Sequence, residues 1–250
     1  MNKVRKILTS KAFIITLLFT VVTFLGLIGY KWVVRKDTIS SIVYNKFKNK
    51  DDYTVYVKED GKYIPFLVID NGYVSGSTLL LRESILDEFR RMNDYSSYYK
   101  DSEIDRFLNG EYYNTLKEIH HLIKNTPIEI YSKEAIGFSG DETEYINRHI
   151  FLLSNKELAF EYENEGKELD YFYKPENRIS YYNGKPMSWL LRTPLGSYFS
   201  VVCGITDEGA LSGCNSFNEY GIRPAFCVDS SAKIKKKEGI VYGEKVYVLE

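Results

Sequence analysis

Apolar residues fall into one long run near the start of the chain and many short runs after it. Residues 12–30 hold no charged side chain, and Trp32, Val33 and Val34 extend the run to the ~20 residues that a helix needs to cross a bilayer. A cleaved signal peptide has a shorter apolar run and then a site of small residues. The pattern therefore predicts a transmembrane helix at residues 12–34, with a cleaved signal peptide and a buried core helix as alternatives.

The residues on either side of this run predict how the chain is divided. A basic tail at residues 1–11 precedes the span, a polar stalk at 35–52 follows it, and one domain occupies 53–250. Basic residues lie on both sides of the span, with a small excess before it. By the positive-inside rule this excess predicts a single-pass protein of the cell membrane with its C-terminal domain outside the cytoplasm.

Within the domain, the spacing of apolar residues changes along the chain. Alternation on both sides of Asp60-Gly61 predicts a β-hairpin, and "STLLLRES" reads as a further strand. Helical spacing follows in "ILDEFRRM", "DSEIDRFLNGEYYNTLKEIHHLI" and "SNKELAF". Later runs have strand character: "HIFLL", "SWLLR", "YFSVVCGI", "ALSGCNSF", "GIRPAFCV" and "EKVYVLE". Helices in the middle and strands at the end predict an α+β domain with a largely antiparallel sheet.

The charge of the domain limits its partners. The chain has 33 basic and 34 acidic residues, and residues 1–36 hold seven of the basic ones and none of the acidic ones. The remainder, 26 against 34, carries a formal charge of −8. This charge argues against nucleic acid or an anionic membrane surface as the main partner.

Three sequence pieces occur in a fixed order: "LLLRESILD" with "SEIDRFLNGEYYNTL", then "IFLLSNKEL", then "WLLRTP" with "GIRPAFCV" about thirty residues later. Over residues 64–230 the chain resembles an uncharacterised bacterial family, many of whose members are secreted or anchored, with the signature Trp-Leu-Arg-Ser-Pro and later Gly-Val-Arg-Pro-Ala. The matching residues here are Trp189, Leu190, Arg192, Pro194, Gly221, Arg223, Pro224 and Ala225. Leu191 and Thr193 depart from the signature. The resemblance implies, remotely, the C-type-lectin-like fold of formylglycine-generating enzymes.

The tryptophan and the arginines of this signature have a structural and a functional interpretation. In a strand, Trp189 and Arg192 face opposite sides, so Trp189 is expected in the core. Arg192 and Arg223 are expected to bind carboxylates of the protein, and an anionic ligand is the alternative. The carboxylates considered are those of Asp207, Glu219 and Asp229.

Tyrosine is abundant, with 22 residues, and concentrates in a polar loop at 161–187. Tyr with Ser, Gly and Asn is the residue set of adaptable binding loops, although an AT-rich genome also raises the tyrosine content. The predicted ligand-binding residues are Tyr171, Tyr173, Tyr181, Tyr182 and, in the ligand interpretation, Arg192.

The sequence offers little catalytic or metal-binding chemistry. His120 and His121 point about 100° apart on a helix, and His149 stands alone. No calcium loop, phosphate loop or nucleophile elbow is found. We therefore expect no catalytic residue, no metal and no cofactor.

Whether Cys203 and Cys214 can form a disulfide depends on the register of the hairpin that contains them. Formylglycine-generating enzymes hold copper with a cysteine pair, so the resemblance leaves an oxidase conceivable. With a three-residue turn at Asp207-Glu208-Gly209, glycine takes the left-handed position, Cys203 faces Gly213, and Cys203 and Cys214 are free. A two-residue turn would place Cys203 opposite Cys214 at a distance a disulfide can span.

The function these observations favour is a membrane-anchored, extracytoplasmic binding or recognition module for a glycan or a protein. The alternatives are an oxidoreductase of the formylglycine-generating kind and a structural subunit of a cell-envelope assembly. Copper-dependent oxygen consumption, binding to an array, or co-purification of a fixed partner would distinguish the three.

Overall fold

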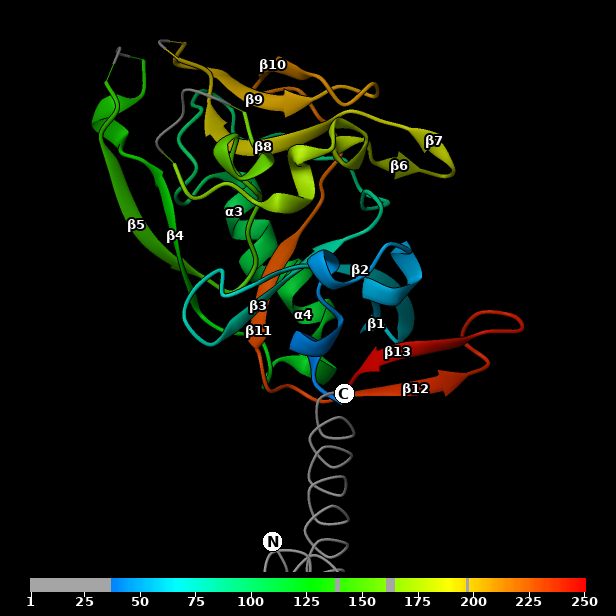
Figure 1. The fold of residues 1–250 in the computed structure, drawn as a ribbon. Helices are drawn as coiled ribbons and strands as arrows, with labels where there is room; N and C mark the ends of the chain where they lie inside the picture. The colour runs from blue at the N-terminus through cyan, green and yellow to red at the C-terminus, as the bar shows by residue number, and fades with distance from the viewer. Residues whose placement is uncertain (1–36, 138–139, 161–164, 197) are drawn as a thin grey trace, which may run out of the picture.

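The computed structural model describes residues 37–137, 140–160, 165–196 and 198–250. A six-stranded sheet forms the lower half of the molecule in Figure 1, and its neighbouring strands are antiparallel except for one parallel pair. Its order is β11 (Ala225–Asp229), β3 (Ser77–Arg82), β2 (Lys62–Asn71), β1 (Thr54–Glu59), β13 (Lys245–Leu249) and β12 (Ile234–Glu238), with β1 and β13 as the parallel pair.

Three smaller sheets surround this one. A three-stranded antiparallel sheet lies at the opposite end of the molecule, and the long hairpin of β4 and β5 runs along one side (Figure 1). The strands are β8 (Trp189–Pro194), β9 (Val201–Ile205) and β10 (Leu211–Asn215); β4 (Thr126–Tyr131) and β5 (Thr143–Arg148); and β6 (Tyr181–Tyr182) and β7 (Lys185–Pro186).

Helices are short throughout the described part of the chain. The α-helical pieces are α3 (Glu103–Phe107) and α4 (Tyr113–Thr115), joined by the π-helical turn η4 (Leu108–Tyr112). Ser102 caps α3 by accepting a hydrogen bond from the Asp105 N–H. The 3₁₀ turns are η1 (Ile39–Ile42), η2 (Tyr44–Lys46), η3 (Lys50–Tyr53), η5 (Lys117–Ile119), η6 (Lys133–Ala135), η7 (Lys156–Leu158), η8 (Asp170–Tyr173) and η9 (Pro175–Arg178).

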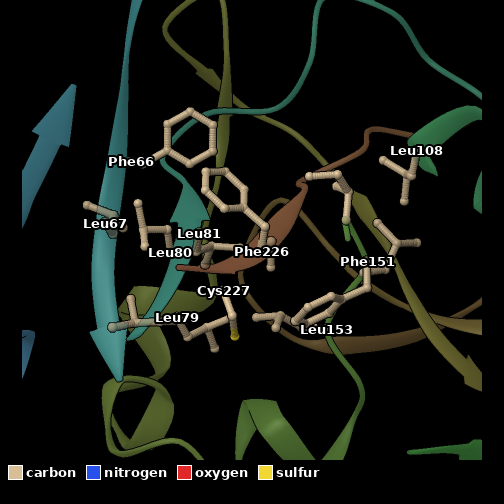
Figure 2. Packing of buried hydrophobic residues seen from close by; sticks show 14 of the residues in the cluster. Phe66, Leu67, Leu79, Leu80, Leu81, Leu108, Phe151, Leu153, Phe226 and Cys227 are labelled. Carbon is tan, nitrogen blue, oxygen red and sulfur yellow. The ribbon is translucent and has the colours of Figure 1, made fainter. Parts of the chain in front are cut away.

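The core packs against the end of the large sheet formed by β3 and β11. Every residue of β3 is buried, because elements cover both faces of the sheet there. Figure 2 shows Phe66 and Phe226 side by side, with ring centroids 5.2 Å apart. Phe151 and Leu153, from the segment before η7, lie on the other side of β11 near Cys227. Burial of these large side chains is the main favourable contribution to the stability of the domain.

The segment expected to be a stalk is partly folded onto the domain. Ile39, Ile42 and Val43 are buried in the core, and the Ile39 N–H donates to the Ala232 carbonyl at 2.8 Å. The folded region therefore includes residues from 37 onward in the described chain.

The expected fold class is wrong. The described chain is mostly sheet with only short helices, and no helix within residues 37–137, 140–160, 165–196 and 198–250 is long and apolar enough to cross a membrane. The span predicted at residues 12–34 lies outside the described residues. The structure thus gives no support to an α+β domain behind a transmembrane helix.

Two local predictions also fail, for one physical reason. Residues 85–92, predicted as a helix, bond to distant segments instead of to their own preceding turn. The Ile85 N–H donates to the Tyr181 carbonyl and the Leu86 N–H to the Ile222 carbonyl. Residues 149–153, predicted as a strand, are irregular apart from one bridge between Phe151 and Ala225. In both places tertiary contacts override the local pattern.

Both predicted turns are confirmed. Asp60 and Gly61 have φ values of 48° and 77° and join β1 to β2, as a type I′ turn requires. Gly209 has a φ of 83°, and Cys203 pairs with Gly213 while Cys214 pairs with Val202. The three-residue turn is therefore the one adopted, and the cysteines of this hairpin are not opposite each other.

We expect all three cysteines to remain thiols and to be unreactive in the folded protein. Within the described residues none of Cys203, Cys214 and Cys227 forms a disulfide, and all three are buried. Burial raises the pKa of Cys227 to about 12 and also raises the pKa of Cys214. Because the thiolate is the reactive form, iodoacetamide at pH 8 should label the native chain far more slowly than the urea-unfolded chain, as measured by mass spectrometry. A peptide linked through Cys203 and Cys214 would contradict this register.

Candidate functional site

Trp189, the first residue of β8, lies fully buried between two arginines. Its indole Nε1–H donates to the carbonyl of Arg178 at 3.0 Å, and the guanidinium carbon of Arg223 is 5.3 Å from the ring centroid. A cation over an indole face is attracted by the ring quadrupole. Trp189 therefore joins the C-terminal strands to the turns before β6.

Arg192, three residues further along β8, is completely buried and bound by two glutamates. Its Nη1 and Nη2 each lie 2.8 Å from a different carboxylate oxygen of Glu157, and its Nε lies 3.1 Å from Glu165 Oε1. Nε also donates to the Glu129 carbonyl and Nη1 to the Leu152 carbonyl, at 3.0 and 2.7 Å. The guanidinium is thus bonded to four separate segments of the chain.

A second layer of hydrogen bonds orients the two carboxylates. The Tyr73 hydroxyl donates to Glu157, and the Thr193 hydroxyl donates to Glu165. The Ser154 N–H also donates to Glu157 Oε2 at 2.8 Å. Such bonds are needed because buried charges are costly unless they are paired and hydrogen-bonded.

The groups around Arg192 keep its buried guanidinium protonated. Its burial by itself lowers the pKa of the guanidinium, but the nearby Glu157, Tyr73 and Glu165 raise that pKa well above its usual value. Glu157 and Glu165 are both fully buried, so this one cation faces two carboxyl groups. Arg192 is therefore held charged inside the protein, where it has no exposed surface for a ligand.

Arg223 is also buried, but the partners of its guanidinium differ from those of Arg192. Burial lowers the pKa of its guanidinium, and the Tyr171 hydroxyl opposes this shift. Its Nε donates to the Arg82 carbonyl at 2.9 Å, while Nη1 has no hydrogen-bond partner among the residues that the structure describes. Within the described residues no carboxylate lies within ion-pair distance of Arg223. The expected partners Asp207, Glu219 and Asp229 are therefore wrong for both arginines.

The remaining signature residues join backbone segments. Leu190 N–H donates to the Gly221 carbonyl at 3.0 Å, and a Cβ on Gly221 would lie 2.7 Å from the Ser188 carbonyl oxygen. Only glycine allows that approach. Pro224 accepts a hydrogen bond from the Arg82 N–H, and Ala225 exchanges hydrogen bonds with Phe151. Pro194 ends β8 opposite Val202.

The predicted ligand-binding tyrosines do not form one surface. Tyr171 is buried, and its ring packs edge-on against Tyr44 with centroids 4.9 Å apart. Tyr182 is half-buried against Phe89. Tyr173 and Tyr181 are exposed, and the Tyr173 hydroxyl bonds to the neighbouring Glu168.

Exposed aromatic residues also occur elsewhere, on three segments at residues 93–98, 198–200 and 215–218 whose backbones are hydrogen-bonded to one another. These residues, which we call the aromatic face, are Tyr95, Tyr198, Phe199 and Phe217, with exposed fractions of 82, 62, 57 and 49%. Hydrogen bonds connect the loops: Ser97 N–H to the Phe199 carbonyl at 2.8 Å, Asn93 N–H to the Ser216 carbonyl at 3.0 Å, and Ser216 N–H to the Ser200 carbonyl at 2.8 Å.

Sequence reasoning missed this face for a simple reason. Phe199 and Phe217 flank strand-like runs, and phenylalanine in such runs is normally a core residue. The signal that could have found them is their neighbours, since "SYFS" and "NSFNEY" place the rings among Ser and Asn.

The histidines lie closer together than their spacing suggested. His120 and His149 both stack on Tyr113, with centroids 3.9 and 4.8 Å from it. Burial, with a smaller effect of His120, lowers the pKa of His149. In the described residues no three side chains of His, Cys, Asp or Glu converge as metal ligands would.

The described chain folds into a mostly β domain. Arg192, Arg223 and the residues next to them connect separate segments of this domain. The chain belongs to the family described as a domain of unknown function, DUF6273, whose model matches residues 75–230. Neither the curated proteins nor the solved structures compared with it contain a match. Membership of an uncharacterised family is thus confirmed, whereas the exact signature and the remote likeness to the C-type-lectin-like fold are not.

Replacing the two signature arginines should have unequal effects. Arg192→Met leaves the buried carboxylates of Glu157 and Glu165 without their cation, a loss of about 3–5 kcal/mol in the free energy of unfolding. Arg223→Met, the matched variant, strands no carboxylate and should cost about 1–2 kcal/mol through lost hydrogen bonds. Urea unfolding of the full chain, followed by tryptophan fluorescence, measures both, and equal losses would contradict the assignment.

Proposed function

We propose that this domain is a binding module that contacts a glycan or a protein through the aromatic face. The observation that carries the proposal is the exposure of Tyr95, Tyr198, Phe199 and Phe217 on adjoining loops. Aromatic rings offer a large contact area with few rotatable bonds. Exposed apolar clusters on folded domains commonly mark interaction sites.

The position of these loops supports the proposal. Residues 198–200 precede β9 and residues 215–218 follow from the end of β10, and residues 93–98 are hydrogen-bonded to both segments. The sheet of β8, β9 and β10 lies at the end of the molecule opposite to β12, β13 and the C-terminus (Figure 1). The first described residues pair with that opposite end, where Thr38 bridges Lys233. The aromatic face is therefore directed away from the point at which the chain enters the domain. A location outside the cytoplasm remains part of the proposal.

The catalytic alternative receives less support. An oxidase of the formylglycine-generating kind needs an accessible pair of thiols. The described cysteines are all buried, and Cys203 and Cys214 are not directly opposite each other in their hairpin. The physical observations therefore favour recognition over redox chemistry.

The test is binding of the labelled full chain to glycan and protein arrays, with the double variant Phe199→Ala/Phe217→Ala beside it. Removing two central aromatic contacts should weaken binding at least tenfold, which corresponds to about 1.4 kcal/mol. The melting temperature should stay close to that of the unmodified chain, because both rings are largely exposed.

Tyr173→Ala/Tyr181→Ala is the matched comparison, since these exposed tyrosines lie in the loop that the sequence had favoured. Array binding that is lost in this variant and kept in the phenylalanine variant would move the site to the tyrosine loop. No binding to either array would overturn the proposal.

A further inference from the structure

Acidic residues outnumber basic ones on the segments that carry and adjoin the aromatic face. Arg91 lies among Asp94, Glu103 and Glu219, and the Tyr98 hydroxyl donates to Glu144 with Glu134 close by. Gly137, in the loop between β4 and β5, lies against the ring of Phe199, so the acidic residues of that loop border the face as well. The acidic residues are Asp94, Glu103, Glu134, Asp141, Glu142, Glu144 and Glu219, and the basic ones are Arg91, Lys100 and Lys133. Seven against three gives this end of the molecule a formal charge of −4.

The hairpin of β12 and β13 has the opposite pattern. It projects from the body of the domain at the far end from the aromatic face (Figure 1). Its strands and the residues next to them carry Lys233, Lys235, Lys236, Lys237 and Lys245 against Glu238, Glu244 and Glu250, a formal charge of +2. Its tip holds Ile240, Val241 and Tyr242, and the side chain of Tyr242 is fully exposed.

The two ends therefore complement each other in charge and in apolar surface. At the end of the aromatic face, exposed aromatic rings lie on segments rich in acidic residues. At the other end, the turn of the β12–β13 hairpin is apolar and its strands are rich in lysine. In protein interfaces a central apolar contact excludes water, while charges around it steer association and set orientation.

We propose that the aromatic face of one copy binds the β12–β13 hairpin of a second copy, so that copies join head to tail. This inference rests on the proposed function, because it names the ligand of the same face. Such a contact is heterologous, so each pair keeps one unused face and one unused hairpin and can add further copies. A hairpin buries little area, so the contact belongs to the weak, transient class, roughly micromolar to millimolar in dissociation constant.

The test is sedimentation velocity on the full chain at rising concentration, with two variants that each block one end. Phe199→Ala/Phe217→Ala removes the face, and Tyr242→Ala/Lys236→Glu removes the hairpin tip and one stem charge. The unmodified chain should form a concentration-dependent series of oligomers that shrinks at high salt, because surface charges are then screened. Each variant alone should stay monomeric, and a mixture of the two should form one-to-one complexes and nothing larger.

A monomeric unmodified chain at every concentration would overturn the inference, and so would a mixture of variants that stays monomeric. Oligomers that persist in either variant alone would also overturn it. The proposed function is tested separately on the arrays, and the protein array includes the full chain itself, so that binding to a second copy counts as binding. If array binding is lost only in the phenylalanine variant while the chain stays monomeric, the binding module stands and the head-to-tail contact is wrong.

Discussion

The buried ion cluster of Arg192, Glu157 and Glu165 is the interaction on which the domain depends. One guanidinium contacts the segments at residues 129, 152, 157 and 165, and its own strand adds the fifth. A buried charge is tolerated only when its partners are fixed. The cluster therefore specifies how these segments meet, because any other arrangement would leave a charge unpaired inside the protein.

Two other arginines, the buried Arg82 and the half-buried Arg148, work in a similar way where regular elements are short. Arg82 bonds bidentately to Glu59 and to the carbonyls of Ser84 and Ile85. Arg148 bonds in the same manner to the buried carboxylate of Asp105. A chain with long irregular segments has many backbone carbonyls outside ladders and helices, and arginine, with five donors, satisfies several of them at once. Arg192 and Arg223 of this chain are both buried and both donate to backbone carbonyls in this way.

The arginine-centred hydrogen bonds stabilise the domain that carries the proposed recognition surface. The segments that carry the aromatic face are connected to one another by backbone hydrogen bonds, and Tyr198 and Phe199 lie between β9 and β8, the strand that carries Arg192. Recognition residues commonly lie on loops that a rigid scaffold positions. A face ordered before it meets its ligand loses less conformational entropy on binding.

The sequence by itself determined the features that depend on local backbone chemistry. Asp60-Gly61 specified a tight hairpin, and Gly209 specified the register that separates Cys203 from Cys214, because only certain residues adopt positive φ without strain. Tertiary structure decided the rest. Residues 85–92 have helical spacing, yet the N–H groups of Ile85, Leu86 and Arg90 bond to segments more than ninety residues away. The partners of Arg192 lie 35 and 27 residues from it, and nothing in the local pattern selects Glu157 and Glu165 over the chain's other carboxylates. Whether a phenylalanine is core or surface likewise follows from what packs against it, which only the folded chain defines.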